Sequence, residues 1–198
     1  MKRRAAITCT AVLLALGLWS ITALSADDED EKKAIAEAQK AVLKLVDSMN
    51  GKGGDVKGQI AAIKKKFEEL KPIMMVYKPR KKGGIGMGKD SEDDIEQTIG
   101  KMGGPKYKMT PKKLADMKAD LIMAGELSKA IAEIAGQDQY AKQYAKKDAA
   151  KWKGYIKEMK KGSDELIAAV KGGNAAKVKT AANNLSASCT SCHSDFRE

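Results

Sequence analysis

Near its C-terminus the chain reads Leu185-Ser-Ala-Ser-Cys-Thr-Ser-Cys-His-Ser-Asp-Phe-Arg197. At the centre of this stretch is Cys189-x-x-Cys192-His193, the pattern for covalent attachment of a c-type haem. Two thiols add to the two vinyl groups of the haem, and the imidazole that follows becomes an axial ligand of the iron. Positions three apart share a face of a helix, so both sulfurs can reach one porphyrin edge. We therefore predict one covalent haem c, with His193 as the proximal iron ligand.

Three other roles of a Cys-x-x-Cys pair fit this sequence poorly. A thioredoxin-type motif follows a strand and precedes a helix, and the sequence shows no such alternation. A structural zinc site uses about four Cys or His ligands, whereas the chain beyond residue 26 offers only Cys189, Cys192 and His193. A disulfide between residues three apart would be strained on a helix. Haem attachment is the remaining interpretation.

The N-terminus has the pattern of a secretory signal peptide. A basic start, Lys2-Arg3-Arg4, precedes an apolar run over residues 5–24, and small residues around Ser25 lead into an acidic segment. This order predicts a signal peptide over residues 1–26 that is cleaved. The alternative is an uncleaved anchor, because the run is near the minimum length of a membrane span. Covalent haem attachment normally takes place outside the bacterial cytoplasm, so signal and motif together predict a periplasmic protein with no integral span after cleavage.

We predict that residues 27–198 form a single domain, helical by its composition, that binds the c-type haem through the motif. Ala, Lys, Leu, Ile and Met dominate and aromatic residues make up 5% of the chain, which favours helix over sheet. The formal net charge is +11, and about +8 remains without the signal, which holds three Lys or Arg residues and no acid. A basic surface favours an acidic protein partner or an anionic membrane surface; the alternative is a lysine coat that serves solubility. Nucleic acid is not an expected partner of an exported chain with few aromatics.

Apolar residues recur at helical spacing along most of the chain. We predict helices over residues 29–50, 55–75, 110–136, 138–171 and 174–196. The apolar positions of 55–75 alternate steps of four and three, the 3.5-residue repeat of a bundle seam. Residues 139–151 hold few large aliphatic side chains and are either a separate short piece or a linker. In the haem-attachment helix, residues 173–197, both cysteines fall on the apolar stripe, so we expect the porphyrin to insert among helices.

Residues 79–110 form a long, glycine-rich insertion between predicted helices, with a short helix around residues 94–99. Its run Gly84-x-Gly86-x-Gly88 invites a phosphate-loop interpretation. However, no strand precedes it, and the spacing matches neither the P-loop nor the dinucleotide pattern. We predict a loop that folds over the haem edge or the end of the bundle.

The end of the chain resembles the cytochrome c′ family, the class II c-type cytochromes. The resemblance rests on the haem motif, the Phe-Arg pair that follows it, and the preceding Leu166-Ile-Ala-Ala-Val-Lys-Gly-Gly-Asn-Ala-Ala-Lys-Val-Lys179. Class I cytochromes c place the motif near the start of the chain and a ligand methionine tens of residues later. The resemblance implies an all-α, antiparallel four-helix bundle, here with an additional helix and the long Gly-rich loop. Family members are often homodimers, and the sequence leaves a homodimer open.

The resemblance also implies two alternatives for the sixth coordination position of the iron. In the family, the face opposite the proximal histidine carries either a methionine, giving a six-coordinate electron carrier, or an apolar residue, giving a five-coordinate iron that binds NO or CO. Met74 lies on the apolar stripe of 55–75 and is the leading candidate for a distal ligand, with Met87 and Met123 as alternatives. A thioether ligand would raise the reduction potential. Arg197 pairs with a haem propionate or with a carbonyl at the helix end, or it faces water as a helix-terminal charge.

We therefore expect an exported monohaem c-type cytochrome that transfers electrons to or from a partner with an acidic docking face. The alternatives are a five-coordinate protein that binds NO or CO, and a protein that merely holds haem. Enzymatic activity is not expected, because a single histidine already bound to iron leaves hydrolytic catalysis without its usual base.

Overall fold

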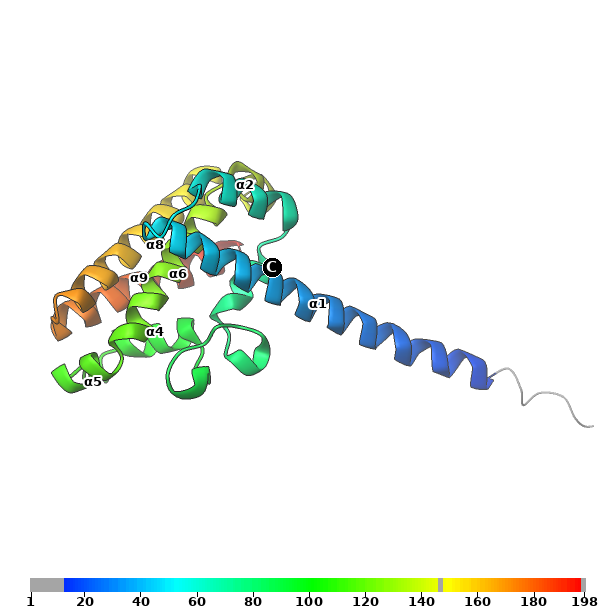
Figure 1. Ribbon diagram of the computed structural model, residues 1–198, viewed down its shortest axis with the longest axis horizontal. Helices are drawn as coiled ribbons and strands as arrows, with labels where there is room; N and C mark the ends of the chain where they lie inside the picture. The colour runs from blue at the N-terminus through cyan, green and yellow to red at the C-terminus, as the bar shows by residue number, and fades with distance from the viewer. Residues whose placement is uncertain (1–12, 146–147, 197–198) are drawn as a thin grey trace, which may run out of the picture. The chain divides into compact units, whose positions relative to one another are not determined.

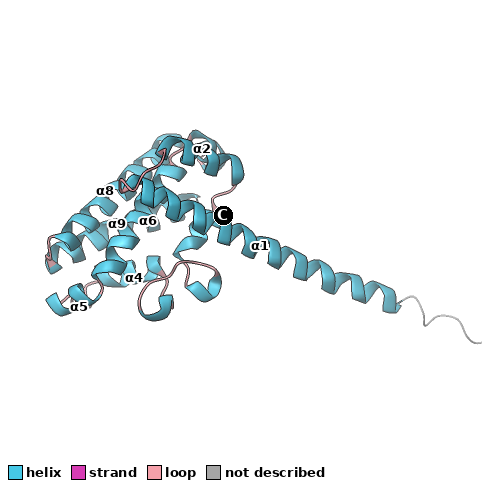
Figure 2. Ribbon diagram, viewed as in Figure 1, coloured by secondary structure: helices cyan, strands magenta, loops and turns pink. Residues whose placement is uncertain are grey.

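The computed structural model describes residues 13–145 and 148–196 of the chain. Within these ranges the chain forms nine α-helices, three short 3-10 helices and no β-strand (Figure 2). A single isolated bridge pairs Met87 with Asp93. The prediction of an all-α fold is confirmed.

The chain divides into two units, Met1–Ala34 and Ile35–Glu198. The first contains the start of helix α1 (Leu13–Met49), and the predicted signal peptide lies outside the described residues over its first part, 1–12. Among the helices that are described, none combines the length and apolar character needed to cross a membrane. The second unit contains the remainder of α1 and every later element, including the predicted haem motif.

Helix α8 (Ala149–Lys171) is at the centre of the second unit, packed against both α6 (Lys118–Ala135) and α9 (Ala175–Phe196) (Figure 1). Ion pairs show that α6 and α8 are antiparallel: Lys129 binds Asp164 at 2.7 Å, and the later residue Glu133 binds the earlier Lys160 at 2.8 Å. The turn at residues 172–174 then returns the chain along α8 as α9, as predicted.

The second-unit part of α1 contributes the fourth long helix of the bundle. Its fully buried residues Ala38, Val42 and Leu45 belong to one apolar core shared with α6, α8 and α9. Close packing in that core depends on Gly162 of α8, where an added Cβ would lie 3.0 Å from Cα of Leu185 in α9. The predicted four-helix bundle is therefore confirmed.

Shorter elements complete the second unit. They are α2 (Val56–Lys66), α3 (Lys71–Met74), α4 (Ile95–Gly103), α5 (Pro111–Asp116), α7 (Asp138–Tyr144) and the 3-10 helices Met75–Tyr77, Arg80–Lys82 and Lys89–Ser91. Helix α4 lies in the predicted insertion 79–110, extends beyond the short helix expected there, and packs along α9. The predicted helix 110–136 is interrupted at Met117, which separates α5 from α6.

The predicted helix over 55–75 is wrong in its second half. Helix α2 ends at Lys66, and Phe67 has extended backbone angles, φ −115° and ψ 104°. Pro72 accounts for the break, because a proline in a continuous helix lacks the N–H for the ladder and clashes with the carbonyl four residues earlier. In the first turn of α3 that missing N–H is harmless. The bundle seam predicted along residues 55–75 is accordingly cut short.

Helix α7 supplies hydrogen bonds to the backbone at this break. The Tyr140 hydroxyl donates to the Phe67 carbonyl at 2.6 Å, and the Leu70 N–H donates to the Tyr144 hydroxyl at 3.3 Å. Tyr140 is fully buried, and burial raises the pKa of its hydroxyl to about 12. The segment with few large aliphatic residues is thus a separate short helix that stabilises an irregular part of the chain.

We expect Tyr140→Phe to lower the free energy of unfolding by about 1 kcal/mol at neutral pH, because one buried hydrogen bond is lost while the ring stays. The folded-state pKa lies above the ordinary value of 10.0, so this hydroxyl contributes stability below pH 10 that is lost as pH rises toward 12. Urea unfolding from pH 9 to 12 should show a smaller alkaline loss in the variant than in the wild type. Tyr107→Phe is the control, since the Tyr107 hydroxyl contacts the Met117 sulfur at 3.7 Å; equal alkaline losses in all three proteins would contradict the prediction.

Candidate functional site

The three residues of the predicted haem motif lie in the last turns of α9 and line one cavity. Cys189, Cys192 and His193 all contribute to its wall, and the two cysteines are half-buried with free thiols. Most other side chains of the wall are apolar, and they come from α3, α6 and α8: Met74, Ala135, Trp152, Ile156 and Met159. The helix periodicity predicted that both cysteines face neighbouring helices, and the structure places them there.

Burial raises the pKa of both thiols, to about 12 for Cys189 and about 11 for Cys192. The nearby carboxylate of Glu96 adds to the effect on Cys189, and that of Asp195 adds to the effect on Cys192. Redox-active Cys-x-x-Cys motifs have a lowered thiol pKa instead, because the thiolate is the reactive form. The surroundings of this motif are therefore unlike those of a thioredoxin-type site.

The imidazole of His193 contacts a carboxylate from another helix. Its Nδ1 lies 3.3 Å from Oε1 of Glu96, the second residue of α4. The hydrogen bond from His193 lowers the pKa of the Glu96 carboxyl, against an opposing effect of burial. Sequence reasoning missed Glu96, because no spacing rule relates the start of α4 to the end of α9.

Aromatic packing holds the motif end of α9 against α8. The ring of Phe196 packs edge-on against Trp152 with centroids 5.3 Å apart, and against Tyr155 at 6.2 Å. Trp152 is fixed in turn by a hydrogen bond from Nε1 to the carbonyl of Ala135 at 3.0 Å. The Tyr155 hydroxyl donates to Asp195 Oδ2 at 2.6 Å. These contacts keep the cysteines next to the apolar wall supplied by α8.

Two methionines lie among the described residues that line the cavity, Met74 and Met159. Met74 is the last residue of the short helix α3. This candidate distal ligand therefore lines the cavity from α3, and the long helix that was predicted to carry it is absent from the described part of the chain. The alternatives Met87, which is buried in the insertion, and Met123 on α6 are not in the cavity wall. Met159 of α8 was not among the candidate ligands selected from the sequence. Arg197 lies outside the described residues.

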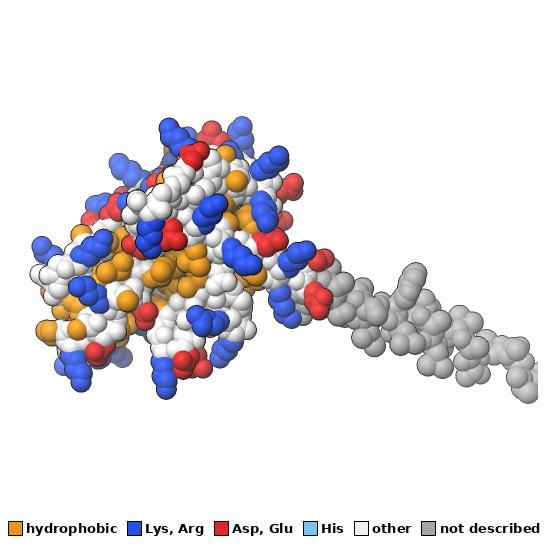
Figure 3. Space-filling view, in the orientation of Figure 1, with side chains coloured by type: hydrophobic (Ala, Val, Ile, Leu, Met, Phe, Trp, Pro, Cys, Tyr) orange, Lys and Arg blue, Asp and Glu red, His pale blue; other side chains and the backbone are white. Residues whose placement is uncertain are grey.

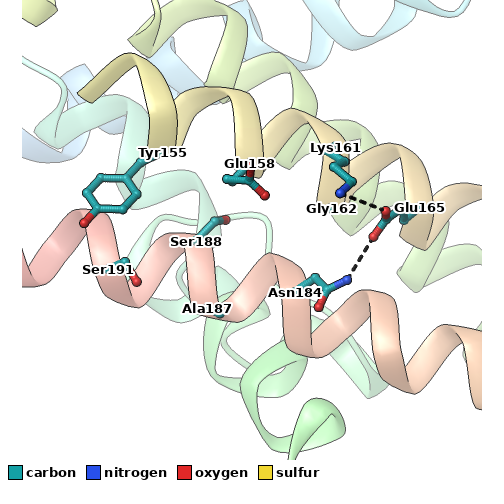
Figure 4. Close-up of a pocket in the computed structure, with 9 residues that line it drawn as sticks. All are labelled: Tyr155, Glu158, Lys161, Gly162, Glu165, Asn184, Ala187, Ser188 and Ser191. Atoms are coloured by element: carbon teal, nitrogen blue, oxygen red, sulfur yellow. Dashed lines mark hydrogen bonds and ion pairs between the residues drawn. The ribbon is translucent and has the colours of Figure 1, made fainter. Parts of the chain in front are cut away.

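The cavity is small, about 30 Å³, whereas drug-sized ligands occupy pockets of about 300–1,000 Å³. A larger groove of about 310 Å³ lies between α8 and α9 beside it (Figure 4). Charged side chains line that groove: Glu165 accepts a hydrogen bond from Asn184 at 3.0 Å and pairs with Lys161 at 3.9 Å. Only the small cavity has thiols, an imidazole and thioethers in its described wall, so the donor set fits haem c there. Side chains around it must rearrange to admit a porphyrin.

A helical bundle in which two thiols and the neighbouring imidazole line one apolar cavity has the features of a haem c-binding cytochrome. The family model described as Cytochrome C′ matches residues 105–197, so this part of the chain, α5 to α9, is similar to the cytochrome c′ family. The matched segment includes Cys189, Cys192 and His193, while Met74 and Glu96 precede it. Comparisons with curated proteins and with solved structures gave no significant match.

Proposed function

We propose that this protein is an exported monohaem c-type cytochrome that carries electrons and has no enzymatic activity. In this proposal haem c is bonded to Cys189 and Cys192, His193 is the proximal iron ligand, and Met74 is the distal ligand. The observation that supports it most is that Met74, far away in the sequence, lines the same cavity as the three motif residues. When bound, the haem iron would take up and release a single electron.

The residues around the cavity would hold the haem and adjust its reduction potential. Helix α9 presents both sulfurs on one face, while Trp152 and Ile156 of α8 give the site a wall that excludes water. Low solvent exposure and a thioether ligand are two of the means by which proteins set a haem potential. The thioether of Met74 would stabilise ferrous iron, as an electron carrier with a raised potential requires.

The charge of the chain supports an acidic redox partner, and the N-terminal sequence supports a periplasmic location. On the face drawn in Figure 3, lysine and arginine side chains are distributed over the helices together with acidic ones, around a central area of apolar side chains. The formal net charge of about +8 that remains without the signal would attract an acidic protein. Electron transfer to such a partner should slow as ionic strength rises, because salt screens the attraction between exposed charges.

The visible absorption spectrum tests the proposal on the full chain produced in a periplasmic expression host with c-type maturation. We expect sharp, separate α and β bands on reduction with dithionite, and little change when CO is added. A broad high-spin spectrum that shifts with CO would instead favour the five-coordinate alternative, a protein that binds NO or CO. A purified protein without a Soret band would contradict the haem proposal altogether.

A further inference from the structure

The contact between Glu96 and His193 joins the motif to a helix outside the family match. Helix α4 ends at Gly103, whereas the match begins at residue 105. The Glu96 carboxylate lies 3.3 Å from Nδ1 of His193, and the two side chains are 31% and 32% exposed, so water only partly screens the contact. The motif itself contains no such partner for its histidine.

A buried carboxylate fixes the start of α4. Asp94 Oδ1 accepts a hydrogen bond from the Gln97 N–H at 3.0 Å and so caps the helix. Its Oδ2 pairs with Lys78 Nζ at 2.9 Å, and the Asp94 side chain is only 8% exposed. Loss of one partner of a shielded ion pair is strongly unfavourable. This cap fixes the residue at which α4 begins. It therefore places Glu96 in the first turn of the helix.

Two glycines bring α4 close to α9. A Cβ added to Gly103 would lie 2.6 Å from Cα of Asn183, and a Cβ on Gly100 would lie 3.2 Å from Oγ of Ser186. The later position on α4 meets the earlier position on α9, so the two helices are antiparallel. The first turn of α4 consequently meets the last turns of α9, where the motif lies.

We propose that Glu96 is a positioning residue for the iron ligand His193, an inference that rests on the proposed haem site. Its carboxylate accepts the hydrogen bond from Nδ1–H, which leaves Nε2 as the nitrogen for iron. A carboxylate at this place fixes the orientation of the ring and raises the basicity of the ligand. A more basic imidazole stabilises ferric iron relative to ferrous iron, so Glu96 lowers the reduction potential of the haem.

The test compares haem-loaded wild type with Glu96→Gln and with the control Glu92→Gln, a nearby exposed position. Both variants remove one negative charge, but only the first weakens the hydrogen bond to His193. We expect the reduction potential to shift upward in Glu96→Gln well beyond any shift in the control. In the ferric cyanide adduct, the Nδ1–H proton of His193 should exchange with solvent about tenfold faster in Glu96→Gln, as expected when a charge-assisted hydrogen bond is weakened.

Equal potentials and equal exchange rates in Glu96→Gln and Glu92→Gln would overturn this inference alone, since haem would still be attached with His193 as its ligand. A wild-type protein that attaches no haem, or whose cyanide adduct lacks a ligand-histidine Nδ1–H signal, would overturn the proposed function and this inference with it. The two failures are therefore distinguishable in one set of samples.

Discussion

The double variant Cys189→Ala and Cys192→Ala should carry no covalently attached haem. Both sulfurs line the cavity from one face of α9, and no other described residue of that wall is a cysteine. Thioether bonds survive denaturation, whereas haem held by iron ligands alone is released when the fold is lost. Mass spectrometry of the denatured chain, together with a haem stain after denaturing electrophoresis, measures the difference directly. We expect the wild type to carry the mass of one haem and the double variant to carry none.

Two further variants make this result specific. Ser191→Ala changes a half-buried residue between the two cysteines, and it should leave the attached haem unchanged. Cys189→Ala alone should retain one thioether, with the α band of its pyridine haemochrome displaced because one vinyl group is no longer saturated. Haem that remained with the denatured double variant would show that the attachment site lies elsewhere in the chain.

The second large effect is expected from Met74→Ala. If the thioether of Met74 is the distal ligand, its removal lowers the reduction potential by on the order of 0.1 V, within the range of about 0.8 V that axial ligands span. The ferrous protein should then bind CO readily, because the sixth position of the iron is open. Potentiometric titration and CO difference spectra measure the two consequences independently.

Met159→Ala is the matched control, because Met159 lines the same cavity from α8. It removes the same thioether side chain and leaves a similar gap in the wall, so general loosening of the site would affect both variants alike. We expect Met159→Ala to change the potential little and to remain unreactive toward CO. If instead CO reacted with Met159→Ala and not with Met74→Ala, the distal ligand would be Met159.

Much of the bundle could be predicted from the sequence because apolar periodicity reports which face of a helix is buried. The last helix was predicted within a residue of its observed bounds, Ala175–Phe196. Periodicity failed at residues 67–75, where apolar spacing continues across Pro72 although the backbone cannot remain helical there. The stripe correctly marked Phe67, Leu70 and Met74 as facing the interior, since they belong to or pack against the core. A short break in the helix thus preserved the pattern while changing the structure.

The candidate site was predictable only where its residues are neighbours in sequence. Cys189, Cys192 and His193 are recognised by local spacing, whereas Glu96 reaches the site through the packing of α4 on α9, which sequence spacing does not encode. Met74 was selected from the apolar stripe of a helix predicted over residues 55–75, and the structure corrects that helix, because α3 rather than a long α2 carries Met74. The helical spacing of Met159 is that of an ordinary core residue, so the sequence does not distinguish it as a site residue.

The close packing of α4 against α9 affects which part of this chain could be transferred to another protein as a unit. The segment that the family model recognises starts after α4, yet α4 buries Ile95, Ile99 and Met102 in the common core. A fragment cut at residue 105 would therefore leave a face of its haem-attachment helix without its neighbour. For grafting or minimisation, the transferred piece must include α4 and also the part of α1 that carries Ala38, Val42 and Leu45, so the segment of recognisable similarity is shorter than the packed unit Ile35–Glu198.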